Sequence, residues 1–149
     1  MIKQISVHCH FHQLVLAASL VADTVTVHNF DSRTATMGLG LIVLSAARMV
    51  EEGRSLEEIL AQVEYMIQNS DLYFLLDSLD NLHKGGRIGK ASHLFGSLLN
   101  IKPVLNLSGG VISAYEKVRG SKGNKALERL IAILADKIDP DKKLYCTVG

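Results

Sequence analysis

The residues best suited to chemistry lie in the segment Gly85-Gly-Arg-Ile-Gly-Lys-Ala-Ser92. Glycines before a helix can expose backbone N–H groups to an anion, and an arginine adds a positive charge that binds carboxylates and phosphates. A nucleotide-binding loop needs four residues between its glycines and a serine or threonine directly after its lysine. Only three residues separate Gly85 from Gly89, and Ala91 follows the lysine. The segment is therefore either a plain glycine turn or a site in which Arg87 helps to hold a carboxylate or a phosphate monoester.

Three histidines alternate near the N-terminus, at His8, His10 and His12. On a strand they would project from one face, and imidazole is a good ligand for zinc. The other histidines are scattered, and no Asp or Glu group stands at ligand spacing beside them. We therefore predict no metal and no cofactor, and keep a metal-dependent hydrolase that uses these three histidines as an alternative function.

Groups for covalent or acid–base catalysis are not assembled in the sequence. Ser97 lacks the first glycine of a nucleophile elbow, and no partnered base is in view. The neighbouring glutamates at 51–52 and 57–58 fall on expected solvent faces, where paired-carboxylate chemistry is not expected. The sequence thus predicts a binding protein rather than an enzyme.

The composition is that of one ordinary globular domain of 149 residues, with 48% apolar and 21% charged residues. A net charge of +1 and the absence of tryptophan argue against a nucleic-acid partner. The two cysteines, Cys9 and Cys146, lie at opposite ends, which favours a reducing, cytoplasmic location. No apolar run reaches the roughly 18 residues of a membrane span, so we expect peripheral membrane contact or none.

The hydrophobic periodicity predicts helices and strands that do not strictly alternate. We expect strands at residues 1–7, 24–29, 72–76 (a buried one), around Pro103, in a hairpin over 106–115 and at 143–148, and helices at 14–22, 37–52, after Ser55, at 78–83, 90–99 and 123–138. This order favours an α/β fold of the mixed, α+β kind, in which a mixed β-sheet packs with helices.

Local signals set several of these boundaries. Thr36 is expected to cap the helix that follows it, and Gly53 to end that helix. Ser55 and Glu58 have the spacing of a capping box, and Pro103 restricts its strand to an edge or a start position. The inward side of the helix at 123–138 is expected to carry Leu127, Leu130, Ile131 and Leu134.

Large apolar side chains are more frequent in residues 37–47 and 94–101 than one helix face requires. A deep core would explain this surplus. A lining for a long aliphatic ligand would explain it as well, since such pockets are mostly apolar with a few placed polar groups. Both interpretations remain open on these residues alone.

Four segments resemble the signatures of the DegV family of fatty-acid-binding proteins, and the likeness covers residues 14–148. They are Asp31-Ser-Arg-Thr-Ala-Thr-Met-Gly-Leu-Gly-Leu-Ile-Val-Leu44 with Ala46-Ala47, Leu79 to Ile88, Gly96-Ser-Leu-Leu-Asn-Ile-Lys-Pro103, and Glu116-Lys-Val-Arg119. The resemblance implies a two-domain α/β protein that encloses one long-chain fatty acid between its domains. It also implies that the protein has no catalysis of its own and presents the acyl carboxylate to a separate fatty-acid kinase in bacteria.

The resemblance further suggests the residues of a binding site. Arg87 matches the signature arginine near the head-group end, and Ser6 is the residue of the early head-group loop that still matches. The apolar tunnel for the tail would be lined by Met37, Leu41, Phe95 and Leu99.

Two departures bear on what this chain can do alone. Family members run to nearly twice this length, and their glycine-rich head-group loop is replaced at residues 6–13. We therefore expect residues 1–13 to be an altered or disordered start and residues 14–149 to be a DegV-like C-terminal lipid-binding domain, incomplete at both ends. The wall of an incomplete tunnel would expose apolar side chains to solvent, and large exposed apolar patches mark protein contact sites. A homodimer is therefore expected. A non-catalytic protein-interaction module, with the apolar helices as simple core, is the other alternative.

Overall fold

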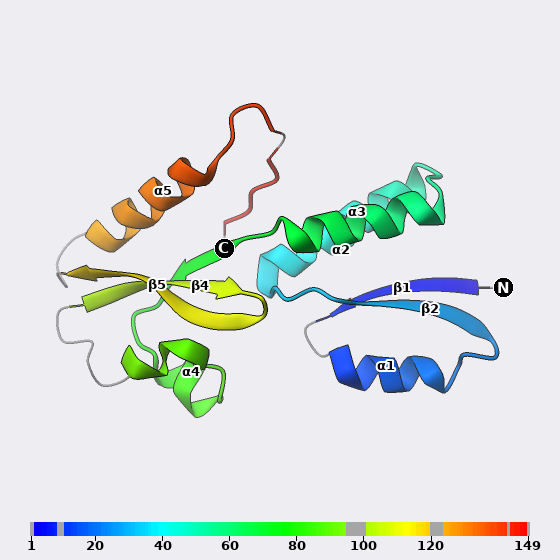
Figure 1. The fold of residues 1–149 in the computed structure, drawn as a ribbon, viewed down its shortest axis with the longest axis horizontal. Helices are drawn as coiled ribbons and strands as arrows, with labels where there is room; N and C mark the ends of the chain where they lie inside the picture. Colours follow the sequence, from blue (N-terminus) through cyan, green and yellow to red (C-terminus); the bar gives the residue numbers. More distant parts are fainter. Residues whose placement is uncertain (1, 9–10, 95–100, 120–123, 143, 149) are drawn as a thin grey trace. The chain divides into compact units, whose positions relative to one another are not determined.

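The computed structural model describes residues 2–8, 11–94, 101–119, 124–142 and 144–148. The chain divides into two compact units, the first made of residues 1–70 with 147–149 and the second of residues 71–146. Each unit has its own sheet and its own cluster of buried side chains (Figure 1). The two units are therefore described one after the other.

The first unit begins with a β-α-β arrangement. β1 (Ile2–His8) and β2 (Val25–Asp31) run parallel, and α1 (Phe11–Ser19) connects them. The pairing sets His8 opposite Asp31, so the carboxyl ends of both strands lie at the same edge. Both predicted strands are confirmed, and α1 begins and ends three residues earlier than predicted.

Two helices follow in the first unit, α2 (Thr36–Glu51) and α3 (Leu56–Gln68), and they pack against each other. Their contact buries one stripe of each helix, formed by Ile42, Ala46, Ile59 and Val63. Partly buried side chains surround this cluster: Phe30, Leu39, Met49, Met66 and Ile67. One side of α2 is covered by these contacts, and four apolar side chains of the helix remain exposed: Met37, Val43, Leu44 and Val50.

The ends of these helices follow their local signals. The hydroxyl of Ser55 accepts a hydrogen bond from the N–H of Glu58, whose carboxylate accepts one from the N–H of Ser55, which completes the predicted capping box. Gly53 has a φ of +71° and ends α2 as predicted. Its N–H and that of the next residue donate to carbonyls of the last turn at 3.0 Å, the pattern of a Schellman motif.

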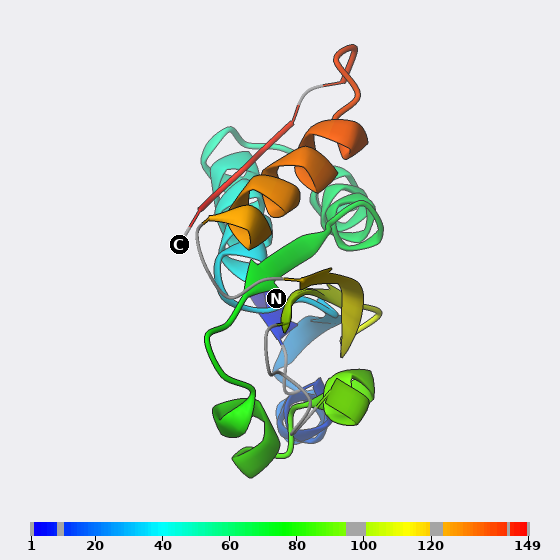
Figure 2. The ribbon, with the colours of Figure 1, turned by 90° about the vertical axis from the view of Figure 1, so that its left-hand side faces the viewer.

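The second unit is a three-stranded antiparallel sheet with helices on both faces (Figures 1 and 2). Its strand order is β3 (Leu72–Leu75), β4 (Ile101–Ser108) and β5 (Val111–Arg119). The predicted hairpin is confirmed, and its two turn residues, Gly109 and Gly110, have φ values of +58° and +81°, as a type I′ turn requires. One face carries α4 (Asp80–Lys84) and the 3₁₀ helix η1 (Gly89–Leu94), and the other carries α5 (Lys125–Lys137).

The predicted mixed α/β class is confirmed, with the parallel and antiparallel pairings in separate sheets. β4 is the central strand of its sheet although it contains a proline. Its pairing with β3 begins with Val104 opposite Leu75, so at Pro103 the strand has β5 as its one neighbour. The N–H that proline lacks therefore interrupts no ladder to β3. The β3 strand, predicted as buried, is half-buried because it lies at the sheet edge.

The α5 helix turns a different side to the sheet from the one predicted. Its buried residues are Ala126 and Ile133. Arg129 donates two hydrogen bonds to the carboxylate of Glu116, at 2.8 and 2.9 Å, and Nζ of Lys137 lies 5.4 and 5.9 Å from the ring centres of two tyrosines of the sheet. These contacts accompany the burial of Ala126 and Ile133 against the sheet. The residues predicted to point inward are consequently half-buried or exposed: Leu127, Leu130, Ile131 and Leu134.

Two further element predictions differ from the structure. The helix expected at 90–99 is a 3₁₀ helix as far as Leu94, and residues 95–99 lie outside the described residues. The strand expected at 143–148 is wrong for residues 144–148, which form no strand.

The helical turn expected at 78–83 is confirmed by α4. Of the helices in the described ranges, none combines the length and apolar character that crossing a membrane would demand.

Candidate functional site

The loop between β2 and α2 is tightly constrained by burial and by its backbone conformation. It leaves the carboxyl edge of the parallel sheet, where ligands of α/β proteins commonly bind. Ser32 and Thr34 are only 1% and 7% exposed, and the Ser32 hydroxyl donates to the Thr34 carbonyl at 3.2 Å. Arg33 and Thr36 have φ values of +49° and +50°, which non-glycine residues seldom adopt. Such strain concentrates at functional sites, so the loop is a candidate site.

The start of α2 lacks the cap that the sequence predicted. Thr36 is the first helical residue and not the cap, so that prediction is wrong. The cap position is taken by Ala35, whose side chain makes no capping hydrogen bond. The first N–H groups of a helix lack the usual partner four residues earlier, and with the helix dipole they favour an anion. In α2 the N–H of Gly38 donates to the Ala35 carbonyl at 3.1 Å, so the N–H groups before it are the candidates for an anion. The start of α2 is thus chemically suited to a carboxylate.

The face of α2 opposite the buried stripe is apolar and uncovered within its unit. Met37 is 50% exposed, Leu44 is 45% exposed, and Leu41 between them is half-buried. Their spacing of four and three residues places them along one side of the helix. The predicted lining residues Met37 and Leu41 are therefore brought together, one turn apart, directly after the constrained loop.

The Gly-Gly-Arg turn does not hold its backbone donors ready for an anion. The N–H of Gly85 donates to the Asn81 carbonyl at 3.0 Å, that of Gly86 to the His83 carbonyl at 3.0 Å, and that of Arg87 to the Leu82 carbonyl at 2.8 Å. With a φ of +66° at Gly86, this is a complete Schellman motif at the end of α4. The interpretation of these glycines as anion donors is wrong, because the preceding helix turn already uses their N–H groups.

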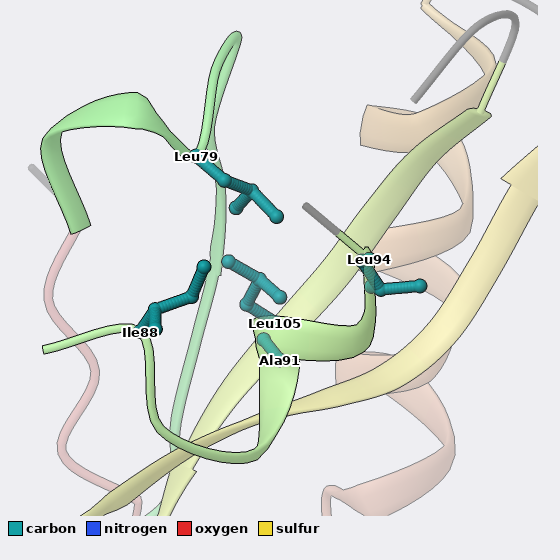
Figure 3. Packing of buried hydrophobic residues seen from close by; sticks show 5 residues of the cluster. All are labelled: Leu79, Ile88, Ala91, Leu94 and Leu105. Atoms are coloured by element: carbon teal, nitrogen blue, oxygen red, sulfur yellow. The ribbon is translucent and has the colours of Figure 1, made fainter. Parts of the chain in front are cut away.

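The residues after this turn serve the core of the second unit. Ile88 and Ala91 pack with Leu79, Leu94 and Leu105 in one buried cluster (Figure 3). The Arg87 side chain remains exposed and donates from Nη1 to the Gly85 carbonyl at 2.8 Å. The plain-turn interpretation therefore accounts for the backbone, and Arg87 stays a candidate as a lone cation.

Three other predicted site residues have different outcomes. Ser6 lies in β1 opposite Asn29 of β2, two residues before the carboxyl edge. The amide oxygen of Asn29 is buried without a hydrogen-bond partner among the described residues. Phe95 and Leu99 lie outside the described residues.

The histidine cluster does not share one strand. β1 ends at His8, α1 contains His12, and His10 lies outside the described residues. In the described part of the chain, no group of three or more His, Cys, Asp or Glu side chains could hold a metal ion. The geometry gives the hydrolase alternative no support.

A hollow of about 220 Å³ lies in the second unit, between the start of α5 and the sheet. An ion pair lies among its lining residues, with Nζ of Lys102 2.9 Å from Oδ1 of Asp77. The hydrogen bond and charge of Lys102 lower the pKa of Asp77. Leucines form part of the wall, but an ion pair in a hollow of this size is not suited to a long aliphatic chain.

Charged pairs elsewhere on the surface have structural explanations. The backbone N–H of Ser55 lowers the pKa of Glu58, with Arg54 adding to the effect. The hydrogen bonds and charge of Arg129 lower the pKa of Glu116, and the same contacts raise the pKa of Arg129. These shifts belong to a helix cap and to the attachment of α5.

Sequence reasoning placed residues 31–44 in a family-like motif but assigned no ligand contact to Ser32, Thr34 or Thr36. A signal was present, since Asp31-Ser-Arg-Thr-Ala-Thr36 is rich in hydroxyl groups and precedes a helix. The left-handed backbone at Arg33 and Thr36 could not be read from it, because neither residue type favours that conformation.

Comparisons of the sequence with known proteins all find the same family. A model of the DegV family, described as an uncharacterised protein family, matches residues 4–149. A DegV domain-containing protein of Deinococcus radiodurans is 48% identical over 115 residues, which are 77% of this chain and 40% of that protein. Protein DegV of Bacillus subtilis is 36% identical over 119 residues, which are 79% of this chain and 42% of that protein. The chain thus spans about two fifths of the length of these curated relatives.

Solved structures show the same likeness. DegV of Bacillus subtilis, described as a fatty acid binding protein, aligns with a TM-score of 0.76 and 33% identity over 91% of this chain and 49% of that one. A DegV family protein of Thermus thermophilus, described for its fatty acid binding, gives 0.71 and 35% over 89% and 48%. A DegV family protein of Eubacterium eligens loaded with heptadecanoic acid gives 0.73 and 25% over 91% and 52%.

Proposed function

This chain belongs to the DegV family, and from that premise we propose that it is part of a carrier protein for a long-chain fatty acid. The observation that carries the proposal is the construction of α2. This one helix combines an uncapped N-terminus after a strained, hydroxyl-rich loop with an uncovered apolar face that starts at the same end. A fatty acid has the same two parts, an anionic head and an apolar tail.

The head group fits the start of α2. A carboxylate there would accept hydrogen bonds from the first backbone N–H groups and gain from the positive end of the helix dipole. Thr36 brings a hydroxyl to this point, and its left-handed backbone sets it apart from the regular helix. A charge-assisted hydrogen bond contributes about 1.5–3 kcal/mol, which makes this contact decisive for affinity.

The tail fits the outer face of α2. Met37, Leu41 and Leu44 extend along the helix from the proposed head-group end, and each offers apolar surface that is open in this unit. Burial of such surface contributes about 25 cal/mol per Å², so a tail that covers three large side chains would add several kcal/mol.

Other predicted residues remain parts of the proposal with tests of their own. The guanidinium of Arg87 has five N–H donors, and its contact with the Gly85 carbonyl leaves others for a carboxylate or for a protein partner. Ser6 is proposed for the head-group side, and Phe95 and Leu99 for the tail. Arg87→Ala should weaken acyl binding, and unchanged affinity would remove Arg87 from the site.

The proposed carrier has no chemistry of its own. It presents the acyl carboxylate to a separate fatty-acid kinase, which transfers the γ-phosphoryl group of ATP to that carboxylate and releases ADP and acyl phosphate. We place this function in the cytoplasm of a bacterium, as the relatives are bacterial. Addition of ATP and such a kinase to the lipid-loaded chain should yield acyl phosphate only when both proteins are present. Equal yield from free fatty acid would contradict the presenting role.

Exposed apolar side chains also support the proposed homodimer. In the first unit they include Val15 and Leu16 on α1 and Leu20 just after it, and in the second Leu127 and Ile131 on α5. Apolar surface of this kind marks contact sites. Sedimentation should show a dimer at micromolar concentration, and a monomer at high concentration would refute it.

Native mass spectrometry of the gently extracted chain tests the central proposal. We expect a mass increase equal to one long-chain fatty acid. Leu41→Asp, which puts a charge on the outer face of α2, should abolish it. Val50→Asp is the matched control, because it adds the same charge to the same helix outside that face. Absence of an adduct, together with no saturable binding of added fatty acid, would refute the proposal for this chain.

A further inference from the structure

Two glycines in the first half of α2 have different surroundings. An added Cβ at Gly38 would lie 2.6 Å from Oγ1 of Thr34, which is closer than such atoms approach. At Gly40, one half-turn further on, nothing lies within 4 Å. Thr34 is nearly fully buried, so its side chain has little room to turn aside. The close approach of the Thr34 side chain therefore requires glycine at position 38, whereas the space around position 40 would accept a larger residue.

We propose that Thr34 and Gly38 form a steric latch that fixes the start of α2 and thereby positions its first backbone N–H groups for the ligand's carboxylate. The latch itself follows from the geometry of the loop and the first turn of α2. Its positioning role rests on the proposed function.

The latch holds Thr34 from two sides. Its carbonyl accepts the hydrogen bond of the buried Ser32 hydroxyl at 3.2 Å, and its own hydroxyl lies against Gly38 in the first turn of the helix. The residue between Thr34 and the helix is Ala35, which supplies no side-chain cap. An uncapped helix start frays readily, so a buried contact between the loop and the first turn replaces the missing cap as the element that keeps the turn in place.

This arrangement suits ligand binding better than an ordinary cap would. A capping side chain accepts hydrogen bonds from the same N–H groups that a carboxylate would use. The Thr34–Gly38 contact fixes the turn by shape and leaves the cap position to a residue without a polar side chain. A site can thus be rigid before the ligand arrives, which lowers the entropy cost of binding.

The latch predicts a change of sign in a cycle of variants followed by thermal unfolding. Gly38→Ala should lower Tm by about 5 °C in the natural chain, because the new methyl group overpacks against Thr34. In a Thr34→Ala background the same change should raise Tm, since alanine favours helix over glycine. Gly40→Ala is the matched control and should raise Tm in both backgrounds. A Gly38→Ala effect with one sign in both backgrounds, or equal to that of Gly40→Ala, would overturn the latch.

The positioning role is tested by comparing a long-chain fatty acid with its methyl ester, which lacks the charge. Gly38→Ala should weaken binding of the acid about tenfold, the loss of roughly one charge-assisted hydrogen bond, and leave binding of the ester nearly unchanged. Gly40→Ala adds a methyl group to the outer face of α2 and should change the affinities for acid and ester by the same factor. Equal losses for acid and ester in Gly38→Ala would overturn the positioning role. If the natural chain binds neither ligand, the proposed function fails and the positioning role with it, whereas the Tm cycle still decides the latch.

Discussion

The start of α2 and the end of α4 both combine glycines with polar side chains, yet they use their backbone donors in opposite ways. At the end of α4, the N–H groups of Gly85, Gly86 and Arg87 all donate to carbonyls of the preceding turn. At the start of α2, the cap position holds an alanine with no side-chain hydrogen bond, and the loop before it is strained. A glycine motif therefore indicates an anion site only once the partners of its N–H groups are known. On that criterion the candidate site moves from α4 to α2.

The largest expected effect is a difference in stability between a buried residue after α4 and a half-exposed residue on α2. Ile88 follows the Gly-Gly-Arg turn directly and is buried in the core of the second unit, so Ile88→Ala should destabilise the chain by about 3 kcal/mol through loss of burial and cavity formation. Met37→Ala removes a similar volume from the half-exposed face of α2 and should cost only about 0.5 kcal/mol. Urea unfolding of the two variants measures the contrast. Equal losses would mean that the outer face of α2 is core as well.

The next effect concerns the glycines that end helices. Gly86 and Gly53 have φ values of +66° and +71°, and an added Cβ at either would meet nothing within 4 Å. Alanine at either position should therefore cost about 1–2 kcal/mol for conformational reasons alone. Asparagine, which tolerates this backbone better, should cost less than alanine in both cases. Unfolding midpoints test this, and a difference between the two sites would show that Gly86 has a further role.

A smaller effect should convert the uncapped helix start into a capped one. Ala35→Asp should stabilise the chain by about 1 kcal/mol, since it supplies a capping oxygen and a negative charge at the helix N-terminus. The same substitution should weaken binding of a fatty acid, because the aspartate competes for the N–H groups and repels the carboxylate. Calorimetry should thus show a higher stability against unfolding together with a lower affinity for the fatty acid. Ser55→Ala at the start of α3 is the control, with lower stability and unchanged binding.

The smallest effect is a pH dependence at the capped helix start. The N–H of Ser55 lowers the pKa of Glu58 in the folded chain, so this carboxylate stabilises the fold above its unfolded pKa. The contribution is lost as the pH falls through the lowered folded pKa. Glu58→Gln keeps an acceptor for the capping box but does not titrate. The difference in Tm between the natural chain and this variant should shrink on acidification, and a difference independent of pH would contradict the assignment.

Much of the fold could be predicted because its signals are local. The capping box of Ser55 and Glu58, the helix end at Gly53 and the hairpin turn at 109–110 depend on residues within one turn of each other. The side of α5 that faces the sheet could not be predicted, because its contacts, among them those of Arg129 and Lys137, are with residues distant in sequence. Pro103 similarly takes its tolerated place from the point at which β3 begins to pair.

The candidate site was predictable only in part, for the same reason. Met37 and Leu41 were expected from the family resemblance, and both lie on the outer face of α2. The head-group end was sought at glycines, which permit unusual backbone conformations cheaply. The structure instead places left-handed backbone at Arg33 and Thr36, where buried neighbours must hold it in place. Such a conformation comes from the surrounding fold and not from the residue itself.

The two-residue turn at Gly109–Gly110 has a consequence for the order in which the chain folds. It joins β4 directly to β5, so the pairing of these strands closes a very short loop. The pairing of β1 with β2 closes a much longer loop, which contains α1. Hairpins form in about 1–10 μs, and contacts of short sequence separation form earlier than distant ones. We expect the β4–β5 hairpin to be structured in the folding transition state, and the parallel pair of the first unit to assemble on the late side of the barrier.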